Sequence, residues 1–350
     1  MTGNMRAIVI PAAELTADLR EGWAAALFSN PLLQTPALRP ELFQIVGRFN
    51  PRTFVAVIED TGCPPVFLPF HRPTRLDSFA GPVPICDYQA FITPISNHIS
   101  VRDALRAAGL RTWIFENLIA PNEVALQTTT TITQPSWRAG LQTGFAPYAE
   151  ELRRTHSSFK NITRNLKVIA RDHGDMRFEC DCADPAVLTS IFSWKAQRFN
   201  GGQEVARWIV DAVDALRTTR SQQFGGVLSA LYVGNRLAAA HFGIRSGRTL
   251  FYWFPAFNPE FDKYTPGNLL LTLLLQHLQK LGCDTLDFGP GSEKYKMYFA
   301  NTKVLVGRGF VELPSVLNFG RAAWRSVHST LQKSQVARSL VGPIMRMVRS

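Results

Sequence analysis

Four consecutive residues, Thr265, Pro266, Gly267 and Asn268, have the types and spacing of a helix start that can bind an anion. Thr265 can cap the helix through its hydroxyl, and Pro266 suits the first helical position, where no backbone donor is needed. Gly267 has no side chain, so a phosphate can approach the amides at the positive end of the helix dipole. The alternative interpretation is an ordinary helix cap without a ligand.

The elements around this turn place it between two strands. Residues 251–257 form an aromatic run before Asn258-Pro259, which predicts a strand buried on both faces. Residues 269–281 are apolar and end at Gly282, which predicts a helix. Residues 286–291 predict the next strand, with glycines at its exit. The turn therefore connects a buried strand to a helix.

This order of elements resembles the core of the GNAT acyltransferase superfamily, in which the turn before the helix holds the pyrophosphate of acyl-CoA. The resemblance implies acyl-CoA, with acetyl-CoA as the leading case, as co-substrate. The implied binding residues are Tyr264, Thr265, Pro266, Gly267 and Asn268. The chain departs from the family pattern Gln/Arg-x-x-Gly-x-Gly/Ala, because it keeps one glycine here and loses the second.

Two later segments resemble a narrower branch, the CelD-like double-GNAT proteins of bacterial cellulose and exopolysaccharide synthesis. The segments are Asp287-Phe288-Gly289-Pro290-Gly291 and Glu293-Lys294-Tyr295-Lys296-Met297-Tyr298-Phe299. Fem-type peptidoglycan transferases are the neighbouring relatives, with an aromatic-Lys-x-x-Phe segment at this place. The resemblance implies an α/β protein of two tandem GNAT-like units, each a twisted mixed sheet flanked by helices.

The resemblance also places the reaction centre directly after the glycines of the strand exit. Acyl transfer needs a base for the acceptor proton and a group that stabilises the developing oxyanion. We assign Lys296 to stabilise the oxyanion and Tyr295 to protonate the leaving thiolate. Either Glu293 or Asp287 acts as the base. Solvated helix positions and a strand-end cap are the alternatives for these residues.

We therefore expect an N- or O-acyltransferase that moves an acyl group from a CoA thioester to an amine or hydroxyl. The expected acceptor is a sugar or an envelope polysaccharide precursor, attacked directly in a ternary complex. One alternative is a Fem-like aminoacyl-tRNA-dependent transferase, in which the turn no longer binds pyrophosphate. A second is a non-catalytic scaffold of polysaccharide assembly, because fold does not imply function.

Further candidates for substrate contact lie outside this region. Residues 152–171 predict one helix with an apolar face and a basic face, and no acidic residue interrupts the basic one. Its basic residues, expected to meet an anionic sugar or lipid-linked precursor, are Lys160, Arg164, Lys167 and Arg171. The alternative is a solvated helix face. His241, in an apolar strand, and Tyr252 are also candidates, although a satisfied core histidine is the simpler interpretation of His241.

A weak internal duplication predicts the domain organisation. Two strands joined by a turn occur at residues 54–70 and again at 226–245, and each pair is followed by a helix and a strand. The spacing of about 170 residues predicts two copies of one α/β unit. We expect an N-terminal unit at 1–140, a catalytic unit at 141–312 and a basic amphipathic tail at 313–350. The proline-marked stretch 135–147 is expected to be the joint.

Composition limits the remaining classes of function. The 350 residues carry a formal net charge of +11, and residues 1–140 contribute nothing to it, because 11 basic residues match 11 acidic ones. Five cysteines without a metal-like spacing predict a reducing, cytoplasmic compartment and no metal site. No Gly-x-Ser-x-Gly motif of a serine hydrolase occurs. The apolar runs are too short to span a bilayer, and no secretory signal is expected.

The tail from residue 318 to 350 combines apolar side chains with six basic residues and no acidic ones. Each Lys or Arg near an anionic leaflet contributes about 1 kcal/mol, so we expect peripheral contact with the inner face of the membrane. Few aromatic residues accompany the basic ones, so the membrane ranks above RNA as the partner of the tail, and no DNA is expected. The alternative is a helix that packs on the second unit.

We predict that the full chain sediments with phosphatidylglycerol vesicles in low salt, whereas a chain ending at Pro314 does not. The expected difference arises because truncation removes all six basic residues of the tail. Equal sedimentation of both chains, or none for either, would remove the membrane role.

Overall fold

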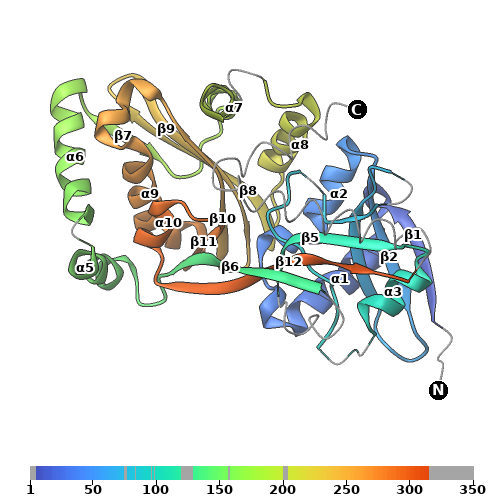
Figure 1. Cartoon of the computed structure of the whole chain (residues 1–350). Helices are drawn as coiled ribbons and strands as arrows, with labels where there is room; N and C mark the ends of the chain where they lie inside the picture. The colour runs from blue at the N-terminus through green and yellow to red at the C-terminus, as the bar shows by residue number, and fades with distance from the viewer. Residues whose placement is uncertain are drawn as a thin grey trace, which may run out of the picture. The chain divides into compact units, whose positions relative to one another are not determined.

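The computed structural model describes residues 5–74, 77–82, 84–95, 97, 99–119, 129–156, 158–199 and 204–314 (Figure 1). For residues 129–131, 158, 160, 163 and 199 it describes the backbone alone. The tail expected at the membrane, residues 318–350, lies outside the described residues.

The chain divides into two compact units. The first comprises 1–34, 46–133 and 307–350, and the second comprises 35–45 and 134–306. Strands β6 (Thr129–Gly140) and β12 (Thr302–Glu312) each begin in one unit and end in the other. The expected domains 1–140 and 141–312 stay a prediction.

Before β6, the described residues of the first unit form strands β1 to β5 and the helices α1 and α3, and α2 is divided between the two units at residue 45. Its elements are β1 (Arg6–Pro11), α1 (Ala17–Ser29), α2 (Pro40–Phe49), β2 (Thr53–Glu59), β3 (Val66–His71), β4 (Phe79–Ala80), α3 (Val101–Ala107) and β5 (Thr112–Ile119). Strands β1 to β4 pair antiparallel in chain order, and β4 pairs with β5 in parallel across α3. The end of β12 lies beside β5, where the Arg102 side chain donates to the Glu312 carbonyl.

The second unit repeats this order of pairings. Its elements are β6, α5 (Phe145–Thr155), α6 (Ser158–His173), β7 (Met176–Glu179), α7 (Pro185–Phe199), α8 (Arg207–Thr218), β8 (Phe224–Val233), β9 (Arg236–Ser246), β10 (Thr249–Phe257), α9 (Pro266–His277), β11 (Thr285–Pro290) and α10 (Lys294–Phe299). Strands β7 to β10 pair antiparallel in chain order, β10 pairs with β11 in parallel across α9, and β6 pairs antiparallel with β11. The predicted mixed α/β fold is confirmed.

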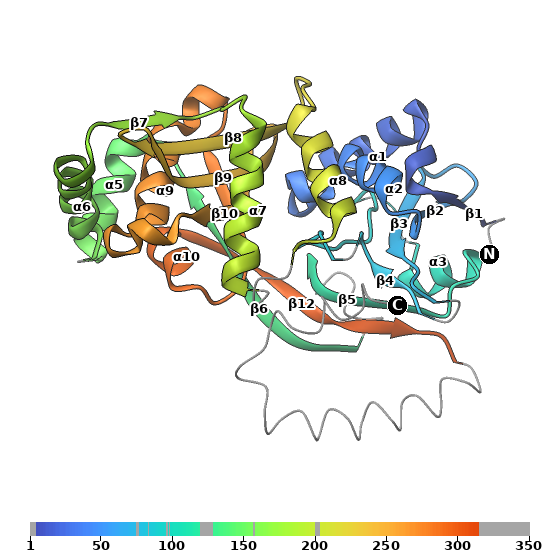
Figure 2. The ribbon, with the colours of Figure 1, turned by 90° about the horizontal axis from the view of Figure 1, so that it is seen from above.

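Helices cover the sheet of the second unit because each presents an apolar face. Phe159, Ile162 and Ile169 of α6 are buried in one cluster with the leucines of α9, as the spacing on α6 predicts. Helix α7 contacts β9 and β10, and Figure 2 shows it crossing the strands of this unit. The strands near the site are therefore held by helical packing.

One prediction of local structure was wrong. Residues 152–171 form the end of α5 and most of α6, because His156 has an extended backbone and its amide closes α5 on the Leu152 carbonyl. The stretch 135–147, expected as a joint, holds the end of β6 and the start of α5. The threonine-rich sequence before Pro135 favours a strand, and that signal outweighs the proline.

Gly226 of β8 tests how closely α8 packs on this sheet. A Cβ at this position would lie 2.7 Å from the Cα of Arg217 and closer still to the Leu216 carbonyl oxygen. We predict that Gly226→Ala destabilises the protein by about 2 kcal/mol or more, measured as a lower thermal midpoint. The matched control is Gly22→Ala in α1, where a Cβ would meet Phe67 and Pro65 at 3.5 Å. The control should be neutral or stabilising, and equal midpoints for both variants would contradict the packing argument.

Candidate active site

Strands β10 and β11 are joined for three residue pairs and then separate. The pairs are Thr249↔Thr285, Leu250↔Leu286 and Phe251↔Asp287, whereas β10 continues to Phe257 and β11 to Pro290. A register shift between β10 and β9 falls at the same point, between Phe251 and Phe254. The later half of β10 therefore presents a parallel-strand edge that an extended ligand can approach.

The turn after β10 leads directly into α9, but it is built differently from the expected cap. Thr265 has φ 54° and ψ 52°, in the left-handed region, and its side chain does not cap α9. Its hydroxyl accepts a hydrogen bond from Asn165 Nδ2 at 3.3 Å, and its carbonyl accepts from the Asn268 amide at 2.9 Å. The Thr265 cap prediction is therefore wrong, because the hydroxyl points to α6.

Gly267 lies in the first turn of α9, where a helix amide has no acceptor within the helix. A Cβ there would meet Phe257 at an ordinary contact distance of 3.5 Å, so the lack of a side chain at Gly267 leaves room in front of the first turn of α9. Pro266 is buried at the first helical position, and Asn268 is half-buried. The residues present fit a phosphate group.

Tyr264 anchors this turn to α6. Its ring is buried, and its hydroxyl donates to Asp172 Oδ2 at 2.8 Å. His173 Nε2 lies 3.1 Å from the Tyr264 hydroxyl oxygen. The hydrogen bond from Tyr264, followed by those from Arg171, lowers the pKa of Asp172. Tyr264, expected to contact the cofactor, thus lies against the C-terminal end of α6 and positions the turn.

The basic face of α6 lies on the surface. Arg164, Lys167 and Arg171 are exposed, and Arg171 pairs with Asp172 at 2.8 Å. The backbone of Lys160 lies on the same helix, and its side chain is outside the described residues. Their role as substrate contacts stays a prediction.

Lys296 is the buried cation of the expected reaction centre. Its Nζ donates to the Pro290 carbonyl at 2.6 Å and pairs with Glu293 Oε2 at 3.1 Å, while Glu293 itself is exposed. Gly291 has φ 136°, and a Cβ at this position would lie 2.9 Å from Lys296 Nζ and collide with the Glu293 carboxylate. Glycine at 291 is therefore needed for the two side chains to meet.

Asp287 is fully buried and engaged through both carboxylate oxygens. Oδ1 accepts from the Gly289 amide at 2.9 Å, and Oδ2 pairs with Arg138 Nε of β6 at 3.1 Å. The β11–β6 register shifts between Asp287 and Gly289, so this carboxylate closes a β-bulge. Trp137, beside Arg138, donates from Nε1 to the Gly291 carbonyl at 3.0 Å.

Aromatic rings link the reaction centre to β9. Tyr295 meets the Tyr252 ring at 6.3 Å, and Tyr252 stacks on His241 at 4.3 Å between centroids with 13° between planes. His241 is fully buried, and neither ring nitrogen bonds to a described residue. Burial, followed by the charge of Lys195, lowers the pKa of His241 to about 3, so the imidazole is neutral at neutral pH. Burial also raises the pKa of Tyr252 well above its usual value.

The structure thus brings Glu293, Tyr295, Lys296, Tyr252 and His241 into one region. Sequence reasoning missed Arg138 and Trp137, which contact Asp287 and Gly291, and it missed Lys195 and Arg198 of α7, which lie over the Phe254 and Phe257 rings of β10. The pairing of β6 with β11 joins segments about 150 residues apart, so no local pattern could reveal the first two. Lys195 and Arg198 have the i, i+3 spacing of one helix face, which is the signal that was available.

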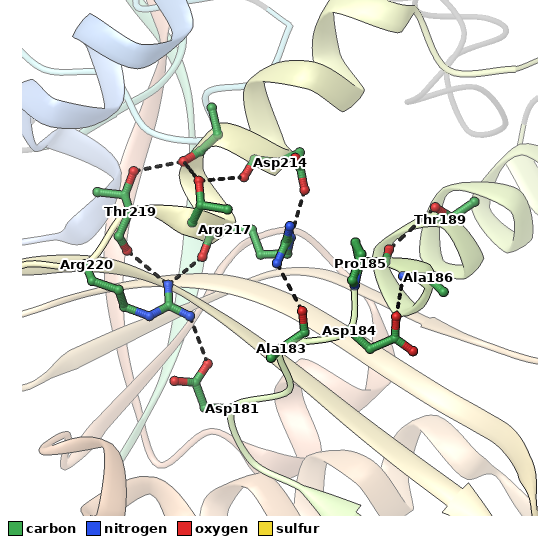
Figure 3. Close-up of polar contacts among 12 residues, drawn as sticks. Asp181, Ala183, Asp184, Pro185, Ala186, Thr189, Asp214, Arg217, Thr219 and Arg220 are labelled. Carbon is green, nitrogen blue, oxygen red and sulfur yellow. Dashed lines mark hydrogen bonds and ion pairs between the residues drawn. The ribbon is translucent and has the colours of Figure 1, made fainter.

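Polar contacts fix the start of α7, which carries those two basic residues (Figure 3). Asp184 Oδ1 accepts from the Ala186 amide at 2.9 Å and caps the helix. Arg217 of α8 pairs with Asp214 at 2.8 Å and donates to the Ala183 carbonyl at 3.3 Å, while Arg220 reaches Asp181 at 3.3 Å. The segment before α7 is therefore tied to the end of α8.

The sequence model of the acetyltransferase (GNAT) domain family matches residues 156–297. This segment has the GNAT fold. It lies within the second unit and includes α9, β10, β11 and the start of α10. No curated protein matches the whole chain significantly.

Solved structures resemble this chain at low sequence identity, and the first two below share its fold. FemX is 11% identical with a TM-score of 0.51, over 75% of this chain and 88% of its own. A tandem GNAT protein from the clavulanic acid biosynthesis pathway is 12% identical with a TM-score of 0.50, over 89% of this chain and 100% of its own. The C-terminal domain assigned to a lysylphosphatidylglycerol synthetase of Agrobacterium fabrum is 14% identical with a TM-score of 0.49, over 89% and 96%.

These findings support the general prediction of a GNAT-type protein with Fem and tandem GNAT structures among its neighbours. They do not single out the CelD-like branch. Within the described part of the chain, no helix has the length and apolar character to cross a membrane. The same residues contain no group of three or more His, Cys, Asp or Glu side chains placed for a metal ion.

The Arg138–Asp287 pair tests whether the bulge of β11 is held electrostatically. We predict that Asp287→Asn destabilises the protein by about 3 kcal/mol, because it leaves a largely buried guanidinium without its charged partner. In a double-mutant cycle, Asp287→Asn with Arg138→Met should lose at least ~1 kcal/mol less than the sum of the single variants in urea unfolding. Additive losses would show that the two groups act separately.

Proposed function

We propose that the chain is an acyltransferase that moves an acyl group, acetyl in the leading case, from a CoA thioester to an amine or hydroxyl. The acceptor is a sugar or an envelope polysaccharide precursor. The observation that carries the proposal is the separation of β10 from β11 just before the glycine-bearing start of α9. An extended thioester arm can lie along the open edge of β10 while its phosphates meet the first turn of α9.

The reaction groups in this proposal lie on β11 and α10. Lys296 Nζ donates two of its three protons to the Pro290 carbonyl and to Glu293, and the third is directed at the oxyanion of the tetrahedral intermediate. Glu293 is exposed and accepts the proton of the attacking amine or hydroxyl. Tyr295 protonates the thiolate as the tetrahedral intermediate collapses. The Asp287 carboxylate already binds the Gly289 amide in the bulge and the Arg138 guanidinium, so we propose that Asp287 positions the site rather than acting as the base.

A Fem-like transfer from aminoacyl-tRNA is the second candidate. It is favoured by the turn before α9, which keeps one glycine of the GNAT pattern and holds Thr265 in the left-handed region. The FemX structure shares the fold of this chain, which makes a different donor compatible with the same strands. In that case the turn would not bind a CoA pyrophosphate.

Isothermal titration with CoA, acetyl-CoA and longer acyl-CoAs separates the two donors. Saturable binding of a thioester at one site per chain is the expected result. Absence of binding by all of them, together with binding of aminoacyl-tRNA, would replace the first candidate by the second. Binding without turnover in the presence of any amine or hydroxyl acceptor would favour the non-catalytic alternative.

We predict that Lys296→Met lowers kcat by about 10²-fold while the affinity for the thioester stays within a factor of about two. The substitution keeps an unbranched side chain, one atom shorter, but removes a charge that acts in the transition state. Thiol release measures kcat, and titration measures donor affinity. Unchanged kcat would place the oxyanion group elsewhere.

Gly267→Val should do the reverse, weakening donor binding by about 10-fold or more with little change in kcat at saturation. A branched side chain fills the space that the phosphate needs, whereas it touches none of the reacting groups. The thermal midpoint of the variant shows whether α9 still packs, since a Cβ at this position meets Phe257 at an ordinary distance. Unchanged donor affinity would move the phosphates away from α9.

A further inference from the structure

Helix α6 borders the start of α9. Asn165 of α6 donates one hydrogen bond to the Tyr264 carbonyl at 3.2 Å and another to the Thr265 hydroxyl at 3.3 Å. Nearer the beginning of α6, Phe159 packs edge-on against Phe299 of α10, with 6.0 Å between the ring centroids. The first half of α6 therefore reaches from α10, which carries the reaction centre, to the turn that is proposed to bind the donor phosphates.

Two exposed basic residues belong to this part of α6. Arg164 and Lys167 lie three residues apart and therefore share one face of the helix. Arg164 directly precedes Asn165, so its Cα lies about 3.8 Å from the Cα of the residue that holds the turn. Within the described part of the chain neither Arg164 nor Lys167 forms an ion pair, whereas Arg171 pairs with Asp172. The two charges nearest the turn are therefore available to a ligand.

The donor extends beyond the part of it that the proposed function places. Its thioester arm lies along the open edge of β10, and its diphosphate meets the first turn of α9. Beyond the diphosphate, acyl-CoA continues into a ribose that carries a further phosphate, the 3′-phosphate. The thioester end points toward the reaction centre, so the ribose leaves the turn on the side of the solvent. Thr265, directly before α9, is exposed there and bonded to α6 through Asn165.

We propose that Arg164 and Lys167 bind the 3′-phosphate of the acyl-CoA donor. We call these two residues the α6 phosphate site. The inference rests on the proposed function, and it assigns the basic face of α6 to the donor rather than to an anionic acceptor. A phosphate accepts charge-assisted hydrogen bonds from a guanidinium and from an ammonium. The site thus distinguishes free CoA thioesters from acyl groups on the phosphopantetheine of a carrier protein, which lacks this phosphate.

CoA and 3′-dephospho-CoA differ by this phosphate alone, so isothermal titration of the full chain with both ligands tests the site. The wild type should bind CoA about 10-fold more tightly than dephospho-CoA. Arg164→Gln/Lys167→Gln should weaken the affinity for CoA by about 10-fold and change that for dephospho-CoA by less than about twofold, so that the preference disappears. Both positions are exposed and glutamine is a good helix former, so α6 should stay folded.

Two further variants separate a local contact from a general effect of charge. The matched control, Arg106→Gln/Arg207→Gln, removes two positive charges from α3 and α8, where both arginines lie in ion pairs. It should keep the wild-type preference for CoA. Arg164→Lys/Lys167→Arg, which retains both charges, should keep most of it. The preference of the wild type should also fall as the salt concentration rises, because the site is exposed. Thermal midpoints of all variants are compared with the wild type.

Equal binding of CoA and dephospho-CoA by the wild type would overturn this inference and leave the proposed function intact. An unchanged preference in the Arg164→Gln/Lys167→Gln variant would overturn it too, as would the same loss in the control. Binding of neither ligand by the wild type would overturn the proposed function and this inference together. If the double variant weakens only the binding of aminoacyl-tRNA, the two residues belong to the second candidate donor and the α6 phosphate site is wrong.

Discussion

The loss of pairing between β10 and β11 is the constraint on which the rest of the site depends. Parallel strands in one sheet ordinarily stay joined along their length, because each unpaired backbone group forfeits a hydrogen bond. Here Asp287 accepts a hydrogen bond from the Gly289 amide and thereby stabilises a bulge in β11. Arg138 neutralises the buried charge of this carboxylate. Carbonyls just beyond that bulge accept hydrogen bonds from Lys296 and Trp137. The geometry at the end of β11 therefore fixes the groups on α10.

Positive charge lies at three places in the second unit. The start of α9 contributes the dipole of a helix, Lys296 contributes a buried ammonium, and α7 contributes Lys195 and Arg198 over the aromatic residues of β10. Their attraction for anions differs in kind. The helix start acts through backbone amides. The Lys296 ammonium is held by its two polar contacts, and the basic residues of α7 lie over aromatic ring faces.

Sequence reasoning predicted most elements of the second unit because their signals are local. The aromatic run of β10, the apolar helix α9 and the stop at Gly282, which closes the 3-10 turn of residues 278–281 after α9, follow from periodicity and capping. Lys296 was assigned through the family resemblance of its segment. The Thr265 conformation was not predictable, because Asn165 draws its hydroxyl to α6 from 100 residues away. The role of Asp287 was equally hidden, since its partner Arg138 lies on β6, which neighbours β11 only in the folded protein.

The two strands that pass between the units have a consequence for the order of synthesis. β6 begins in the first unit and then pairs with β11 of the second, and the end of β12 comes after the second unit in the chain yet lies beside β5 of the first. A ribosome that has released residues 1–133 has therefore not yet supplied the last strand of the first unit. That unit reaches its full complement of strands only after the segment bearing the reaction centre has been made.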